Sequence, residues 1–228
     1  SISLLAGKSC PWAKGCYAEA VEQPDGKRKV VDGPDTEFRC FSASQEAMYK
    51  ATYDARKRNL ELIKASLGSV PAMADLIEGS LKHKATKKDL TKGLMVRAHV
   101  SGDMFHFRYL LAWAEVARRN PDWMVYGYTK AVKMVTIWGP VAFPKNFSLT
   151  LSYGGKDDHL IEESGMKYSK VVHSEEEAEA LGLPIDMDDS LASDPDHGPF
   201  ALLIHGSQPK GSDAAKALVQ IKKRKKAA

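Results

Sequence analysis

The sequence predicts an α/β protein whose parallel strands form a partial (βα)6 barrel with its helices on the outside. Six short β-type runs alternate with helical patterns along the chain. Strands that alternate with helices pair in parallel βαβ units. Two of the runs are polar on one face, whereas parallel strands covered by helices on both sides are apolar throughout. A polar inner face favours a partial barrel with a ligand-holding interior over an open sheet.

The six predicted strands are short runs rich in β-branched and aromatic residues. They span residues 1–5, 94–101, 123–129, 147–153, 167–173 and 200–205. In the second run, Arg97, His99 and Ser101 share one face, and Val96 and Val100 lie on the other. We expect the first three side chains to point into the barrel and the two valines to contact helices.

The fourth run shows the same alternation, with Ser148, Thr150 and Ser152 opposite its apolar side chains. Helical patterns fill the intervals between the runs. They cover residues 44–67, 71–81, 107–117, 131–137, 157–164, 175–181 and 213–226. Nothing in the sequence resembles a linker or an internal repeat, so residues 1–228 are expected to form a single domain.

Composition is typical of a soluble globular protein, with 43% hydrophobic residues. No apolar run approaches the roughly 20 residues that a membrane-spanning helix needs, and the first residues lack a basic leader. We therefore expect a cytoplasmic protein that does not enter a membrane. Much of the net charge of +4 comes from a basic C-terminal tail, residues 222–228. This tail either contacts nucleic acid or is a solvated helix end.

Three cysteines, Cys10, Cys16 and Cys40, lie within the first 40 residues, and the chain contains no others. An odd number of cysteines in a cytoplasmic chain argues against a disulfide framework. All three lie in a long predicted loop, residues 6–43, which follows the first strand. Barrel active sites lie at this end of the strands. The clustering favours a metal site that the three thiols share.

Three thiolates without an obvious fourth partner fit a 4Fe–4S cluster with one open iron better than a closed tetrahedral zinc site. The spacing of the cysteines does not decide this alone, because zinc sites favour closer pairs. Zinc binding and unligated thiols are the alternatives to the cluster.

Other polar residues near the predicted strand ends are candidates for ligand binding. Asp103 either binds a ligand amine or the cluster, or caps the helix that follows it. His99 and His205 are either rim ligands or core residues. Lys130 either neutralises an anionic ligand or is a solvated lysine. Gly154 begins a glycine pair that resembles an anion-binding loop or a simple turn.

Several segments resemble a bacteriophage family known as gene product eighty-eight. They are residues 9–11 (SCP), 15–18 (GCYA), 97–103 (RAHVSGD), 126–130 (YGYTK) and 149–155 (LTLSYGG). The resemblance covers nearly the whole chain and implies a phage protein in the host cytoplasm. It implies no particular activity.

The pattern is more distantly similar to radical S-adenosylmethionine (SAM) enzymes, which hold a three-cysteine cluster after the first strand of a partial barrel. In that resemblance Gly102 and Asp103 would hold the SAM amine, and Lys130 and the segment from Ser152 to Gly154 would shape the pocket. The chain departs from the family spacing C-x3-C-x2-C. Three hypotheses follow: a radical-SAM-like enzyme, a non-catalytic iron–sulfur protein for electron transfer, sensing or structure, and a nucleic-acid-associated accessory protein.

Overall fold

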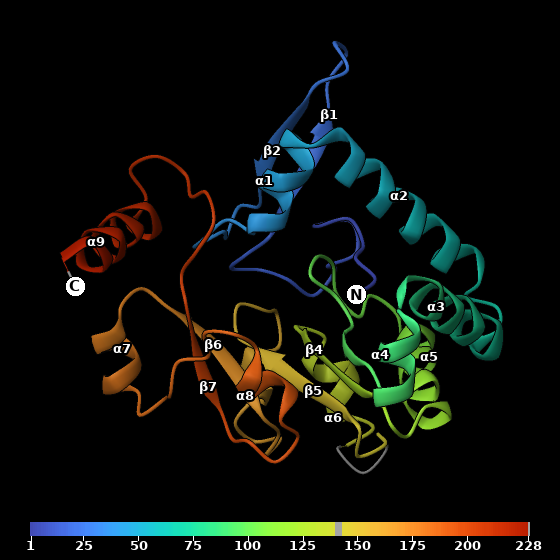
Figure 1. The fold of residues 1–228 in the computed structure, drawn as a ribbon. Coiled ribbons are helices and arrows are strands. Elements are labelled where there is room, and N and C mark those ends of the chain that lie inside the picture. The colour runs from blue at the N-terminus through green and yellow to red at the C-terminus, as the bar shows by residue number, and fades with distance from the viewer. Residues whose placement is uncertain (140–142, 228) are drawn as a thin grey trace.

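A curled parallel sheet forms the centre of the molecule (Figure 1). The computed structural model describes residues 1–139 and 143–227. Within them, five parallel strands lie side by side in sequence order: β3 (Met95–Arg97), β4 (Met124–Thr129), β5 (Phe147–Ser152), β6 (Tyr168–Val172) and β7 (Phe200–Leu203). Helices lie between consecutive strands along the chain. The predicted α/β fold with a half-barrel sheet is confirmed.

The outer face of the sheet carries the main hydrophobic core. The helical elements of the half-barrel are α3 (Val70–Lys84), α4 (Lys87–Lys92), α5 (Phe107–Arg119), α6 (Val132–Thr136), the 3-10 turn η2 (Asp158–Leu160), α7 (Glu175–Ala180) and α8 (Ser190–Ser193). Helix α5 has a continuous apolar side, and its fully buried Trp113 belongs to the same cluster as Val125 and Leu151 of the sheet. Helix α3 packs against α5 from outside.

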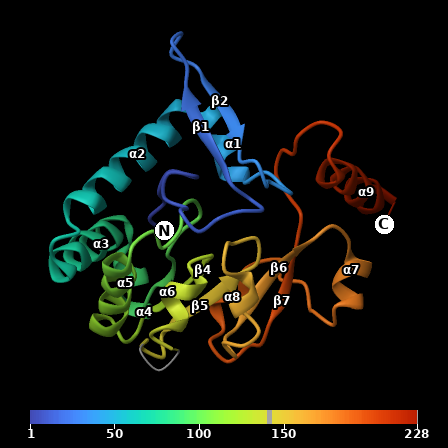
Figure 2. The same cartoon turned by 180° about the vertical axis from the view of Figure 1, so that it is seen from behind.

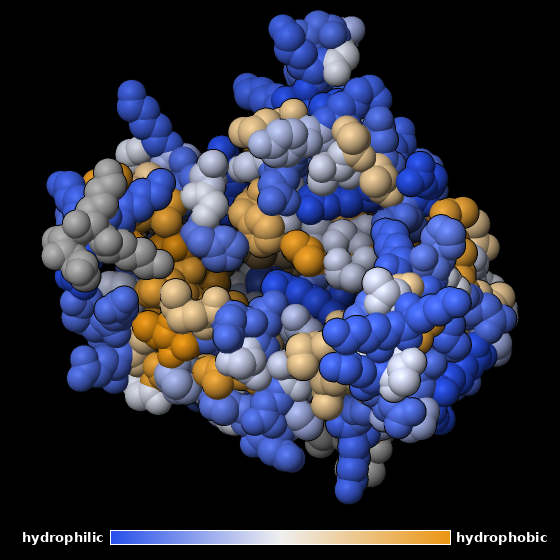
Figure 3. All heavy atoms as spheres, viewed as in Figure 1, coloured by the Kyte–Doolittle hydropathy of each residue, from blue (hydrophilic) through white to orange (hydrophobic). Residues whose placement is uncertain are grey.

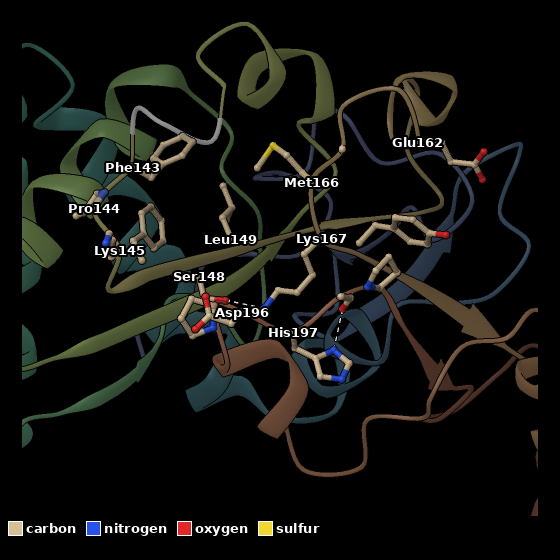
Figure 4. Close-up of a pocket in the computed structure, with 16 residues that line it drawn as sticks. Phe143, Pro144, Lys145, Ser148, Leu149, Glu162, Met166, Lys167, Asp196 and His197 are labelled. Carbon is tan, nitrogen blue, oxygen red and sulfur yellow. Dashed lines mark hydrogen bonds between the residues drawn. The ribbon is translucent and has the colours of Figure 1, made fainter.

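The inner face of β5 is polar, as the alternation predicts. Ser148, Thr150 and Ser152 are all buried on this face of β5. Helix α8 fills part of the interior, where Ala192 packs against Tyr126. The Ser148 hydroxyl donates to the Ala192 carbonyl oxygen at 2.7 Å. The inner face of β5 is therefore lined by hydroxyl groups, and Ser148 at its start also lines a second cavity with Lys167 and His197 (Figure 4).

The predicted first strand, residues 1–5, is not part of the sheet in the described structure. It runs beside the end of β3 and makes two backbone hydrogen bonds, from Ile2 N to Ala98 O (3.3 Å) and from Leu4 N to Ser101 O (2.8 Å). Regular pairing fails because β3 ends at Arg97, after which the backbone bends. The sequence predicts six strands, and the sheet formed by the described residues contains five.

The bend after β3 also changes where its side chains point. Val96 is buried in the core, as predicted. The expectation that Val100 contacts helices is wrong, because it is 36% exposed and lines a cavity on the other side. Strict alternation holds only while the backbone stays extended.

The long loop between residues 6 and 43 contains a β-hairpin that the sequence analysis missed. Strands β1 (Ala18–Glu22) and β2 (Arg28–Asp32) pair antiparallel across a turn at Gly26. The hairpin projects from the molecule, and Figure 3 shows that its tip is hydrophilic on this face. Both views place the N-terminal segment between this hairpin and the sheet (Figures 1 and 2).

The helical pattern over residues 44–67 corresponds to two helices, α1 (Phe41–Met48) and α2 (Lys50–Ala65). Tyr49 separates them with an extended backbone. The C-terminal helix α9 (Asp213–Ala227) stands apart from the sheet in both views, and Arg224 pairs with Glu176 of α7. No helix of the described ranges is long and apolar enough to cross a membrane. Nucleic-acid binding by the basic tail stays a prediction.

Candidate metal centre

One cavity of about 180 Å³ lies at the carboxyl ends of the strands and is lined by all three cysteines. The cavity brings together most of the residues that the sequence analysis selected. Besides the cysteines these are His99, Gly102, Asp103, Lys130, Ser152 and His205. The thiols are partly buried, and none of them forms a disulfide in the described structure. Residues separated by up to 195 positions therefore share one site.

Tight turns place Cys10 and Cys16 on the cavity wall. The Cys10 N–H donates to the carbonyl oxygen of Gly7 at 2.9 Å. The N–H groups of the two residues before Cys16 donate to the carbonyl oxygen of Gly154, at 2.8 and 2.9 Å. Gly154 follows β5, so the cysteine loop is fastened directly to the carboxyl edge of the sheet.

Cys40 reaches the same wall from the far end of the loop. The Gly15 carbonyl oxygen accepts hydrogen bonds from the N–H groups of Glu37 (2.8 Å) and Phe38 (3.1 Å), which draws this segment toward Cys16. Cys40 then occupies the position immediately before α1. The two distant parts of the loop meet through these backbone groups and through the Thr36 hydroxyl, which donates to the Tyr17 carbonyl oxygen at 2.6 Å.

The buried carboxylate of Glu46 stabilises this arrangement through hydrogen bonds and an ion pair. Its oxygens accept from Ala6 N (3.1 and 3.3 Å), from the Ser101 hydroxyl (3.0 Å) and from Arg56 Nη1 (2.9 Å). Glu46 is fully buried on α1. It links the start of the cysteine loop, the segment after β3 and helix α2. The sequence analysis missed Glu46, because an acidic residue in a helix usually lies at the surface.

The electrostatics of the cavity combine thiol groups with a cation. Burial raises the pKa of Cys10 well above its usual range, and Asp103 and the other two thiols add to the shift. Burial also raises the pKa of Cys16, against the opposing charge of Lys130. Burial alone would lower the pKa of Lys130, but the negative charges of the cysteine thiolates and of Asp103 outweigh it and raise that pKa. Its ammonium group donates to the Ser152 hydroxyl at 2.8 Å.

The donor set differs from that of a closed mononuclear site. Among the described residues, no group of three or more His, Cys, Asp or Glu side chains is placed to hold a single metal ion. A single ion needs ligands that converge on one point. A 4Fe–4S cluster binds each thiolate at a different iron, so it takes thiols that are set further apart.

Asp103 connects the segment that follows β3 with the end of β4 through hydrogen bonds. Its oxygens accept from Met104 N (2.6 Å), from the Thr129 hydroxyl (2.6 Å) and from Lys130 N (3.0 Å). Burial raises the pKa of this carboxyl, and the hydrogen bonds oppose that shift. The helix-cap alternative is wrong, because His106 caps α5 through its ring nitrogen. Asp103 thereby sets the position of Lys130 in the cavity.

Gly102 is required by close packing. Its backbone has φ +91°, and a Cβ there would lie 2.6 Å from Ser9 Oγ and 2.7 Å from Leu4 Cβ. We expect Gly102→Ala to lower the free energy of unfolding by about 1 to 3 kcal/mol, measured by urea denaturation. Gly79→Ala is the control, because that glycine lies within α3 with open space around it. This substitution should raise the free energy of unfolding by up to about 1 kcal/mol. Equal stabilities for the two variants would contradict this account.

The glycine pair that begins at Gly154 does bind a carboxylate, but one from its own chain. The N–H groups of Gly154 and Gly155 each donate to one oxygen of Asp158, both at 2.8 Å. The anion-loop interpretation therefore describes an internal turn. Gly154 contributes to the site through its carbonyl oxygen, which fastens the cysteine loop.

The family model for gene product 88 matches residues 1–225. The chain belongs to the gene product 88 family. Comparisons with curated proteins and with solved structures found no match. The match to the family model extends over the cysteine loop and the half-barrel, and it includes every residue that lines the cavity.

Two residues that line this gene product 88 cavity, Arg97 and Tyr128, share a carboxylate partner that lies outside its lining. Arg97 lines the cavity and donates through Nη1 to Asp189 at 2.6 Å. The hydroxyls of Tyr126 and Tyr128 donate to the same carboxylate, at 3.2 and 2.9 Å. Asp189 has φ +65°, which is unusual for a residue with a side chain. It lies far from these partners in sequence, so no local pattern indicates the cluster.

Proposed function

We propose that this protein binds one 4Fe–4S cluster through Cys10, Cys16 and Cys40. The observation that carries the proposal is that three thiols from both ends of a long loop line one cavity at the carboxyl edge of a half-barrel. Thiolates are the usual ligands of such clusters. The remaining walls include a cation, Lys130, whose positive charge suits a negatively charged thiolate assembly.

The residues of the chain prepare the cavity for this group. Because burial raises the pKa of Cys10 and Cys16, their thiols hold protons until metal displaces them. Lys130, held by Ser152 and by its own N–H bond to Asp103, supplies a fixed positive charge beside them. When bound, the cluster supplies one-electron transfer chemistry.

The geometry favours a cluster that carries electrons or senses redox state over one that acts on SAM. The cavity of about 180 Å³ is smaller than the roughly 300 Å³ at which small-molecule pockets begin. Asp103, which the SAM resemblance would assign to the amine, already accepts three hydrogen bonds. Electron transfer or redox sensing is therefore the proposed role.

A radical-SAM-like enzyme is the second candidate, favoured by the position of the cysteines at the carboxyl edge of a half-barrel. The two candidates differ in what binds the fourth iron. Electron paramagnetic resonance of the reduced cluster, recorded with and without SAM, separates them. A spectrum that SAM changes, with a weaker change in Asp103→Ala, would support the enzyme.

The cluster itself is tested by purification under strictly anaerobic conditions. We expect brown protein whose reduced form gives an iron–sulfur paramagnetic resonance signal. Colourless protein that carries zinc after the same purification would contradict the proposal.

A further inference from the structure

The cysteine cavity has one wall residue with an unused buried nitrogen. His99 follows β3 and is only 4% exposed. Its Nε2 lies 2.8 Å from the Tyr109 hydroxyl, while Nδ1 has no hydrogen-bond partner among residues 1–139 and 143–227. Leaving a buried polar atom unpaired costs about 1 to 3 kcal/mol. His99 lines the cavity, so a partner bound inside the cavity would account for this unpaired atom.

The other candidates for binding the cluster are less suited to it. Both oxygens of Asp103 are used by donors of the chain itself. His205 is exposed, and its ring lies against Phe41 with centroids 4.8 Å apart. His99 is as buried as Asp103 but keeps a nitrogen without a hydrogen-bond partner among the described residues, which makes that nitrogen the best donor atom.

The bond to Tyr109 prepares the imidazole for metal. Burial lowers the pKa of His99 to about 3, with a further contribution from Arg97, so the ring is neutral. Burial also raises the pKa of Tyr109, which keeps its hydroxyl protonated. If Nε2 carries the proton and donates to Tyr109, the lone pair of Nδ1 is available to a metal. Histidine ligands of metals are typically held through their second nitrogen in this way.

We propose that His99 Nδ1 is the fourth protein ligand of the cluster, so that the site consists of three cysteines and one histidine. This inference rests on the proposed cluster. It goes further, because it supplies a ligand for the iron that three cysteine ligands would leave open. A cluster with four protein ligands has no site for the amine and carboxylate of SAM. The inference therefore assigns the site to electron transfer or sensing.

Pulsed electron paramagnetic resonance tests the assignment directly. Protein labelled with ¹⁵N-histidine is loaded with iron and sulfide, reduced, and examined for a nitrogen nucleus coupled to the cluster spin. We expect strong coupling in the wild type, its loss in His99→Ala, and its retention in His205→Ala, a second histidine on the same cavity. A cluster without histidine coupling in the wild type, or with coupling that survives His99→Ala, would overturn the assignment.

His99→Cys provides a second test, in which the proposed ligand is exchanged for another ligand and not removed. An anionic thiolate in place of a neutral imidazole should lower the midpoint potential of the cluster, because it stabilises the oxidised state. A potential that does not change would also overturn the assignment. The two proposals fail differently: wild type that binds no cluster contradicts the proposed function, whereas a cluster without nitrogen coupling contradicts only the role of His99.

Discussion

Glu46→Ala is expected to lower the free energy of unfolding by about 3 to 5 kcal/mol, because it breaks a buried ion pair by removing one partner. Arg56 would be left with 9% side-chain exposure and without its counter-charge. The Ala6 N–H and the Ser101 hydroxyl would each lose their acceptor as well. Because these groups start the cysteine loop and follow β3, we also expect weaker cluster binding.

Urea denaturation of the metal-free protein measures the stability effect. Lys50→Ala is the matched control, because Lys50 pairs with Asp54 on the exposed side of neighbouring helix α2 and its loss should change little. The double variant Glu46→Leu with Arg56→Met should recover much of the loss, since it leaves no lone charge buried. A Glu46→Ala variant as stable as Lys50→Ala would show that the buried carboxylate does not hold the loop.

Replacing any one of Cys10, Cys16 and Cys40 by serine is expected to abolish stable cluster binding. Each thiolate would hold a different iron, so each substitution leaves one more iron without an anionic ligand. The chain has no other cysteine that could substitute. Absorption spectra after anaerobic reconstitution measure the loss, and each variant should keep the secondary structure of the wild type by circular dichroism.

Cys40→Ser is the most informative of the three, because Cys40 lies 24 positions after Cys16. Folding places it in the same cavity through the contacts of Gly15 with Glu37 and Phe38. A Cys40→Ser variant with full iron and sulfide content would mean that the two cysteines at the start of the loop suffice. The shared three-thiol site would then be wrong.

The half-barrel could be predicted from the sequence because strand alternation is a local pattern with a physical cause. Ser148, Thr150 and Ser152 occupy the polar inner face, and their neighbours fill the apolar outer one. The cysteines could be grouped because they are few and close in sequence. Their convergence on one cavity needed the additional expectation that loops after parallel strands meet at one edge.

The parts that could not be predicted depend on contacts between distant residues. Asp158 accepts the hydrogen bond that the N–H group of Gly154 donates, and the sequence around neither residue indicates this contact. Glu46 is buried only because Arg56 and the loop surround it. The exposed position of Val100 follows from a backbone bend that the alternation does not encode. Pro24-Asp25-Gly26 was a usable signal for the hairpin, since turn residues there join two β-type runs.

Metal and sulfide analysis of anaerobically purified wild-type protein tests the central claim most directly. Iron, zinc and acid-labile sulfide are measured in one sample and expressed per chain. Three thiols that share a 4Fe–4S cluster predict about four irons and about four sulfides, with no stoichiometric zinc. One zinc per chain without sulfide, or protein that takes up no metal although all three thiols are reduced, would contradict the account.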